Sequence, residues 1–372
     1  MGSVQGLKKV AVAAGVASAL GALASTGKRI NQALGAGASG ARLARMQASP
    51  QWRGGVFQNR RRTDHIAPTG QRDALERFIR GSQARKPPVD IPVRTPQAAG
   101  TGASGLHVTW LGHASVLVEL DGRRFLLDPV WSDRCSPSQQ VGPRRLHPTP
   151  GQLADLAPID AVVISHDHYD HLDMASIMTL AHETTATFVV PLGIGAHLEA
   201  WGVAPTRIVE LDWEESHVVA GVTLTCVESQ HFSGRGLKRD GTLWASWVLA
   251  GWDERVFFSG DTGYFDGYAA LGQAHGPFDV SLMAVGAYDA AWRAIHLDPE
   301  EAVQAVTELD GGLVIPIHWC TFTLAPHPWA EPVERLLTAA QAAQVRTYIP
   351  VVGERVTPGS DLPEQTRWWA PA

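Results

Sequence analysis

The sequence has few cysteines, and their scarcity argues against a protein held together by disulfide bonds. The 372 residues include three cysteines, Cys135, Cys226 and Cys320, which lie far apart and form no Cys-x-x-Cys pair. Charged residues make up only 18% of the chain and hydrophobic residues 45%, which is an ordinary globular composition. A chain of this length can bury a large core and hold more than one domain.

Acidic residues are nearly absent from the first 100 residues, which contain 4 Asp or Glu and 16 Lys or Arg, a net charge of +12. The remaining residues contain 33 acidic and 15 basic side chains, a net charge of −18. A basic segment before an acidic body suggests an anionic partner, either a membrane or a nucleic acid. A solvated basic linker is the alternative.

Long apolar runs are absent except near the N-terminus. Lys8 and Lys9 precede the apolar residues 10–24, and small residues at positions 22 and 24 resemble a cleavage site. The run is short for a spanning helix, so residues 1–25 are predicted to be a secretory signal or an anchor. An Ala-rich leader is the alternative. The protein is thus expected at a membrane, either exported to the periplasm or cytoplasmic.

Two further regions follow this segment. Residues 26–105 are predicted to form a basic, loosely packed extension, in which Trp52, Phe57 and a helix near 71–80 pack on the body. Residues 106–372 are predicted to form the main domain, where short apolar runs end in turn residues. Strands are expected at 108–110, 115–120, 124–127, 161–165, 222–228, 255–259 and 313–317, and helices at 174–182, 195–201, 299–309 and 332–343.

Histidine and aspartate side chains follow the ends of these strands in separate parts of the chain. The candidate metal ligands are His166, His168, Asp170, His171, His231, Asp261 and His318. Sites in sheet-based α/β folds gather on loops outside strand ends, and imidazoles with carboxylates are ligands for zinc-like metals. The sequence therefore predicts one metal site built from distant segments.

The spacing of these residues suits two metals. His166 and His168 point the same way in an extended segment, and His231 would complete a site of three imidazoles. Asp261 has two carboxylate oxygens and can bridge two metals. His318 would join Asp170 and His171 at the second metal. Two metals close together suit the hydrolysis of phosphate esters by a metal-bound hydroxide.

This pattern resembles the metallo-β-lactamase fold superfamily over roughly residues 106–355. A narrower resemblance, to the N-acyl-phosphatidylethanolamine-hydrolysing phospholipase D group and its RomA-like bacterial relatives, rests on longer segments. These are Trp110–Ser115, Asp128–Ser132, Gly142–Arg145, His168–Asp173, Gly260–Tyr264, His296–Ala302 and His318–Trp319. The resemblance implies an α/β fold, a four-layer αββα sandwich, with two zinc ions that cleave a phosphodiester of a membrane phospholipid. Histidine and aspartate ligands also suit iron or manganese.

Further residues are predicted to act around the metals. Asp170 is expected to orient the attacking hydroxide, and His296 to assist the leaving group by donating a proton or by bonding to phosphate. The residues expected to contact substrate or to support the metal ligands are Tyr264, His113, Asp128, Arg144 and Arg145. For each of these, a purely structural role is the alternative.

The leading interpretation is a phospholipase D-type hydrolase, and the alternatives are a lactonase or a small-molecule phosphodiesterase on the same fold. The expected partner is a phospholipid at a membrane surface and not a nucleic acid, because no accessory domain for nucleic-acid processing is present. The sequence does not fix the oligomeric state, and a homodimer is compatible with it.

Overall fold

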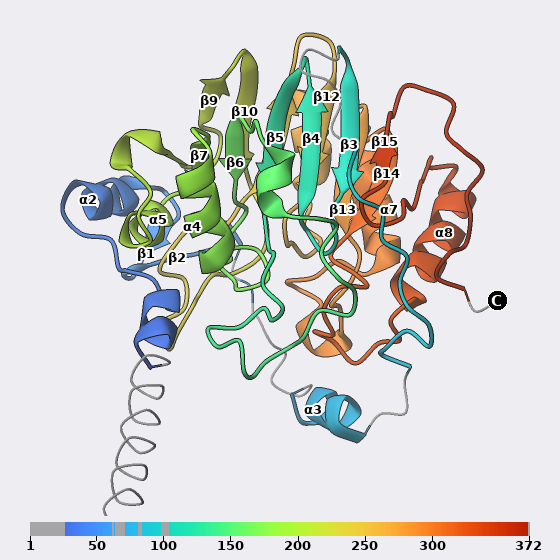
Figure 1. Cartoon of the computed structure of the whole chain (residues 1–372), viewed down its shortest axis with the longest axis horizontal. Coiled ribbons are helices and arrows are strands. Elements are labelled where there is room, and N and C mark those ends of the chain that lie inside the picture. Colours follow the sequence, from blue (N-terminus) through green and yellow to red (C-terminus); the bar gives the residue numbers. More distant parts are fainter. Residues whose placement is uncertain (1–26, 62, 64–70, 81–83, 98–103, 371–372) are drawn as a thin grey trace, which may run out of the picture.

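The computed structural model describes residues 27–61, 63, 71–80, 84–97 and 104–370. Two β-sheets face each other (Figure 1), one with seven strands in the order β15-β3-β4-β5-β6-β7-β8 and one with six in the order β14-β13-β12-β11-β10-β9. The strands of the first sheet are β3 (Leu106–Trp110), β4 (Val116–Leu120), β5 (Arg123–Leu127), β6 (Ala161–Val163), β7 (Thr187–Pro191), β8 (Ile208–Leu211) and β15 (Arg355–Val356). Those of the second are β9 (Ser216–Val219), β10 (Val222–Val227), β11 (Ser246–Ala250), β12 (Arg255–Phe258), β13 (Val280–Ala284) and β14 (Leu313–Ile317).

Helices cover the outer faces of both sheets. The main helices are α4 (Met174–Glu183), α5 (Gly195–Ala200), α6 (Tyr268–His275), α7 (Pro299–Leu309) and α8 (Glu331–Ala343). The strands and helices expected from the sequence agree with these bounds to within two residues. Residues expected at strand ends, such as Ser165, instead belong to the loops that follow.

Successive side chains of a strand pack into different layers of the sandwich. In β4, Val116 and Val118 belong to the core between the two sheets, whereas Leu117 packs with α4 and α5 on the outer face. In β6, Val163 faces the inner core and Val162 the outer one. Successive side chains of a strand point to opposite faces, so a sheet that is apolar on both faces needs cover on both. The predicted α/β sandwich of four layers is therefore confirmed.

The N-terminal segment packs more tightly than the sequence predicted. It contains α2 (Gly40–Ala48), β1 (Trp52–Arg53), β2 (Val56–Phe57) and α3 (Gln71–Arg80), the last as expected. Met46 and Phe57 are buried in the main core. Arg42 bonds to Glu199 at 2.7 Å and to Glu210 at 2.5 Å. The expectation of loose packing is therefore wrong for residues 27–61, because buried apolar side chains and ion pairs join them to the body.

The predicted signal or anchor segment, residues 1–25, lies outside the described residues. Within the part of the chain that the structure describes, no helix combines the length and the hydropathy that crossing a bilayer requires.

The N-terminus of α7 offers a test of local stability. The Asp298 carboxylate accepts from the Glu301 N–H at 2.9 Å, and the Glu301 carboxylate accepts from the Asp298 N–H at 3.2 Å, while Pro299 occupies the first turn. Asp298→Ala is expected to lower the free energy of unfolding by about 1 kcal/mol, as the loss of a cap does. Urea denaturation would measure this. Asp298→Asn removes the charge but keeps an oxygen that can cap the helix, so it should lose less stability. An equal loss of unfolding free energy in both variants would contradict the capping explanation.

Candidate metal centre

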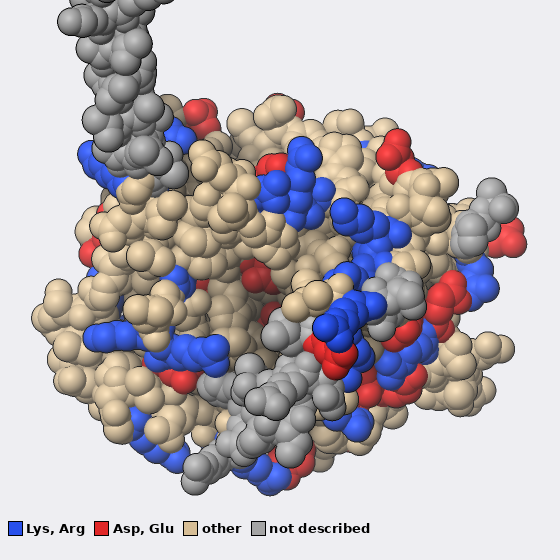
Figure 2. All heavy atoms as spheres, turned by 90° about the horizontal axis from the view of Figure 1, so that it is seen from below, with Lys and Arg blue, Asp and Glu red and all other residues tan. Residues whose placement is uncertain are grey.

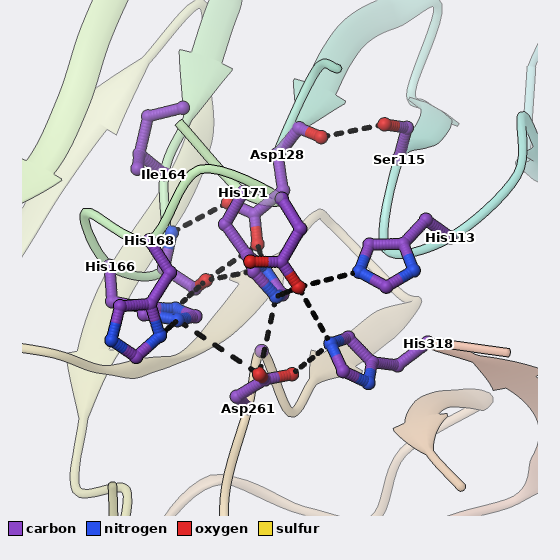
Figure 3. Close-up of polar contacts among 12 residues, drawn as sticks. His113, Ser115, Asp128, Ile164, His166, His168, His171, Asp261 and His318 are labelled. Atoms are coloured by element: carbon purple, nitrogen blue, oxygen red, sulfur yellow. Dashed lines mark hydrogen bonds and ion pairs between the residues drawn. The ribbon is translucent and has the colours of Figure 1, made fainter. Parts of the chain in front are cut away.

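The predicted metal-ligand residues meet at one edge of the sandwich (Figure 3). Each lies in a loop that follows a strand: residues 166–171 after β6, His231 after β10, Asp261 after β12 and His318 after β14. β5, β6 and β7 run parallel, as do β12, β13 and β14. Parallel strands end at the same edge of a sheet, and the two facing sheets bring both sets of loops together.

Four of these side chains form a first group, His166, His168, His231 and Asp261, whose candidate ligand atoms lie within 4.8 Å of one another. His168 Nδ1 lies 2.8 Å from His166 Nε2 and 3.3 Å from His231 Nε2. Asp261 Oδ2 lies 3.9 Å from His166 Nε2 and 3.7 Å from His231 Nε2. Three imidazole nitrogens and one carboxylate oxygen thus surround one point, as the sequence predicted.

A second group contains Asp170, His171, His318 and also His113. Asp170 Oδ2 lies 2.9 Å from His113 Nε2, 3.5 Å from His171 Nε2 and 3.2 Å from His318 Nε2. Asp261 reaches this group too, because its Oδ1 is 3.1 Å from His318 Nε2 and its Oδ2 is 3.3 Å from His171 Nε2. Asp261 therefore stands between the two groups, as a bridging carboxylate would.

The spacing of these atoms fits metal ions. Two ligand atoms on one tetrahedral zinc are about 3.4 Å apart when each bond is about 2.1 Å, and the distances above scatter around that value. His171 Nε2 and Asp261 Oδ1 are buried and, among the residues that the structure describes, make no hydrogen bond. Buried polar atoms are normally paired, so these atoms have the character of ligands. The two groups could each hold a metal ion.

Hydrogen bonds to the far side of three rings fix their orientation. Asp128 Oδ2 accepts from His171 Nδ1 at 2.7 Å, and the Ile295 carbonyl accepts from His231 Nδ1 at 2.9 Å. Ser165 Oγ donates to Asp128 at 2.5 Å and therefore accepts from His166 Nδ1 at 2.9 Å. In a neutral ring held in this way, Nε2 carries no proton and faces the cluster, and this is the form that binds metal. Asp128 thus lies where its predicted supporting role requires.

The charges of the cluster also favour a cation. Burial alone would raise the pKa of Asp261, but His171 and His318 hold it well below its ordinary value. Burial alone would lower the pKa of His318, but Asp261 and Asp170 raise it to about 9. The ionised carboxylates therefore attract positive charge into a site that is almost closed to water. A bound metal ion would satisfy the same attraction.

His113 and His296 stand beside these groups. The sequence predicted only a supporting role for His113, yet its Nε2 lies among the atoms of the second group. Its backbone φ of 53° turns the loop after β3 back toward the site. His296 Nδ1 lies 3.9 Å from Asp261 Oδ2 and makes no hydrogen bond to any residue in the described part of the chain. Both rings can therefore act on whatever the cluster binds.

Three predicted substrate residues point elsewhere. The Tyr264 hydroxyl donates to Glu308 at 2.6 Å, so the structure does not bring it to the cluster. Arg144 is exposed and pairs with Asp133 at 2.8 Å. Arg145 donates to the Val130 carbonyl, and the centre of its guanidinium lies 5.2 Å from the centroid of the Phe322 ring. These contacts hold the Tyr264 and Arg145 side chains in the fold, and the sequence motifs gave no sign of them.

Comparisons with known proteins agree with this geometry. Residues 123–319 match the family model described as beta-lactamase superfamily domain. An uncharacterized protein of Mycobacterium tuberculosis is 49% identical over 91% of this chain and 91% of its own length. N-acyl-phosphatidylethanolamine-hydrolyzing phospholipase D 1 of Caenorhabditis elegans is 38% identical over 63% of this chain and 69% of its own length. Igni18, a metallo hydrolase of Ignicoccus hospitalis, shares the fold with a TM-score of 0.53 and 23% identity, over 68% of this chain and 97% of that one.

The family model covers more than half of the chain, and the Caenorhabditis elegans relative is matched over more than two thirds of its length. The resemblance inferred from the sequence motifs is confirmed by these matches. The chain therefore belongs to the beta-lactamase superfamily and is a metal-dependent hydrolase of that family.

Proposed function

We propose that this hydrolase uses two zinc ions to cleave a phosphodiester bond of N-acyl-phosphatidylethanolamine or a related phospholipid. The products would be phosphatidic acid and an N-acylethanolamine. The use of two metals is supported by the position of Asp261, because its two carboxylate oxygens face different groups of imidazoles. The substrate part is supported by the name of the Caenorhabditis elegans relative at 38% identity.

The candidate ligands would hold the two metals in two sets that share Asp261. His166, His168 and His231 would hold one metal, Asp170, His171 and His318 the other, and Asp261 both. Bound metals of this kind activate water and stabilise charge on a phosphoryl oxygen. The Asp170 carboxylate, which lies between His113 and His318, would orient the attacking water.

His296 is the proposed partner of the leaving oxygen. Its Nδ1 faces Asp261 at 3.9 Å and has no hydrogen-bond partner within the described structure. A nitrogen in this position can donate a hydrogen bond or a proton to the oxygen of the departing N-acylethanolamine.

The surface beside the cluster supports an anionic lipid as partner. A depression of about 1120 Å³ is lined by Arg85, Lys86, Arg134, Arg144 and Arg145. Arg145 of this lining lies over the ring of Phe322, whose centroid is 5.2 Å from that of His113 in the second group. Figure 2 shows Lys and Arg side chains around a recess on the lower face of the molecule, with acidic atoms visible inside it. Basic side chains near a bilayer surface attract anionic lipids.

The test is a vesicle assay with zinc-loaded protein. Vesicles that contain N-acyl-phosphatidylethanolamine should yield phosphatidic acid and N-acylethanolamine, while vesicles of phosphatidylcholine alone should yield much less product. His168→Ala removes a first-group ligand and should abolish release while the circular dichroism spectrum stays unchanged.

No release by fully zinc-loaded protein would overturn the phospholipid proposal. Hydrolysis of a lactone or of a small phosphodiester by the same sample would then favour the alternatives on the same fold. Release by His168→Ala at the unchanged rate would argue against the metal centre itself.

A further inference from the structure

A buried side-chain amide of the N-terminal segment forms two hydrogen bonds with the backbone of one candidate metal ligand. Asn59 Nδ2 donates to the His231 carbonyl at 2.9 Å, and its Oδ1 accepts from the His231 N–H at 3.2 Å. The two residues are 172 positions apart in sequence. Both hydrogen bonds are buried, so neither backbone group can turn to water instead.

The Asn59 side chain is itself held in place. Its Oδ1 also accepts from Trp244 Nε1 at 3.0 Å, and the Phe57 N–H two residues earlier donates to the Asp240 carbonyl at 2.9 Å. Asn59 as a whole is only 8% exposed. An amide fixed in this way cannot change rotamer without breaking several buried bonds, so it can define the position of His231.

Asn59 complements the bond on the imidazole ring. The Ile295 carbonyl accepts from His231 Nδ1 and so fixes the ring, whereas Asn59 fixes the backbone from which the ring projects. Together they aim Nε2 at His168 Nδ1, 3.3 Å away. His231 lies in a loop after β10 and not in a strand, so its backbone has no ladder to hold it.

The same segment also holds the loop that carries the other ligands. Arg235 is buried and donates to the Ala33 carbonyl at 2.9 Å, and to the Asp167 and Leu172 carbonyls at 2.7 Å each. Asp167 and Leu172 lie on either side of residues 168–171. The N-terminal segment therefore contacts the loop after β10 directly and reaches the loop of residues 166–171 through Arg235.

We propose that Asn59 is a positioning residue for His231, which makes the N-terminal segment a working part of the metal centre. This inference rests on the proposed metal site. Groups that orient a metal ligand typically change metal affinity by about 10- to 100-fold when removed. Asn59→Ala should therefore weaken zinc binding by that factor at the first group and leave zinc binding at the second group unchanged.

The experiment titrates the full-length metal-free protein with zinc in competition with a chromophoric chelator. Visible spectra of the cobalt-substituted protein would report the ligand geometry of each site. Gln58→Ala, an exposed neighbour, should match wild type. Asn59→Ser keeps one polar atom, so its zinc affinity at the first group should lie between those of wild type and Asn59→Ala. The serine variant also provides the test if the alanine variant does not fold.

The outcomes separate the inference from the metal centre. A folded Asn59 variant could keep both zinc affinities and the cobalt spectrum of wild type and show only a lower melting temperature. Asn59 would then be merely structural, and the positioning role would be overturned while the metal centre would still stand. A wild-type chain that binds no zinc would overturn the proposed metal centre as well.

Discussion

Asp261→Asn is expected to lower the proposed phosphodiesterase turnover by at least about a thousandfold, which corresponds to about 4 kcal/mol of transition-state stabilisation. The reason is its double position, since its Oδ1 is 3.1 Å from His318 Nε2 and its Oδ2 is 3.7 Å from His231 Nε2. The amide keeps the shape but not the negative charge, so both metals would bind more weakly. Steady-state kinetics and elemental analysis of the same sample would measure this.

The control lies five residues further along the chain. Asp266→Asn removes an exposed carboxylate that pairs with Arg61, outside the cluster. Its metal content and turnover should equal those of wild type. An Asp261→Asn protein that retains two metals and turns over within about twofold of wild type would exclude a bridging role for Asp261.

Metal removal is expected to lower the melting temperature by about 5 °C. A ligand that binds only the folded protein stabilises it by about 4 kcal/mol when present at a thousand times its Kd, and a loss of that size shifts the melting temperature by several degrees. Without a metal, the partly buried Asp170 carboxylate would depend on the rings of His113, His171 and His318 as partners. Differential scanning calorimetry with and without a chelator would show the shift.

Zinc added back in excess should restore the original transition. The Asp261→Asn variant should respond less to the chelator, because it holds metal more weakly from the start. An identical transition in chelated and zinc-loaded wild type would mean that the cluster is stable without metal, and that its histidines and aspartates satisfy one another.

Much of this architecture could be predicted from the sequence because it depends on local patterns. The apolar stretches at 116–120 and 161–163 are strands that contribute to two different cores. The His166–His171 segment could be placed at a strand end because a buried strand directly precedes it. The predicted ligand set rests on that placement, since metal sites need few residue types in close proximity.

The remaining features depend on contacts that no local pattern encodes. The position of His113 in the second group results from a left-handed turn after β3, with its N–H bonded to Thr321 Oγ at 2.6 Å. Asn59 has no motif around it, and its role becomes visible only when β2 lies beside the loop of His231. Tyr264 follows the Asp261 motif closely, but its ring turns toward Glu308.

The N-terminal segment was misjudged for a related reason. Its many basic residues and its glycines are typical of a solvated linker, and the partners that neutralise them lie far away in sequence. Arg42 meets Glu210 across 168 positions. Long-range pairing of this kind converts a composition typical of a linker into a packed layer.

The most direct test of the central claim is hydrolysis of N-acyl-phosphatidylethanolamine in water enriched in oxygen-18, followed by mass spectrometry of both products. Attack of water on phosphorus predicts one heavy oxygen in the phosphate of phosphatidic acid and none in the N-acylethanolamine. Label in the N-acylethanolamine hydroxyl, or no product from the zinc-loaded protein, would contradict a two-metal phosphodiesterase.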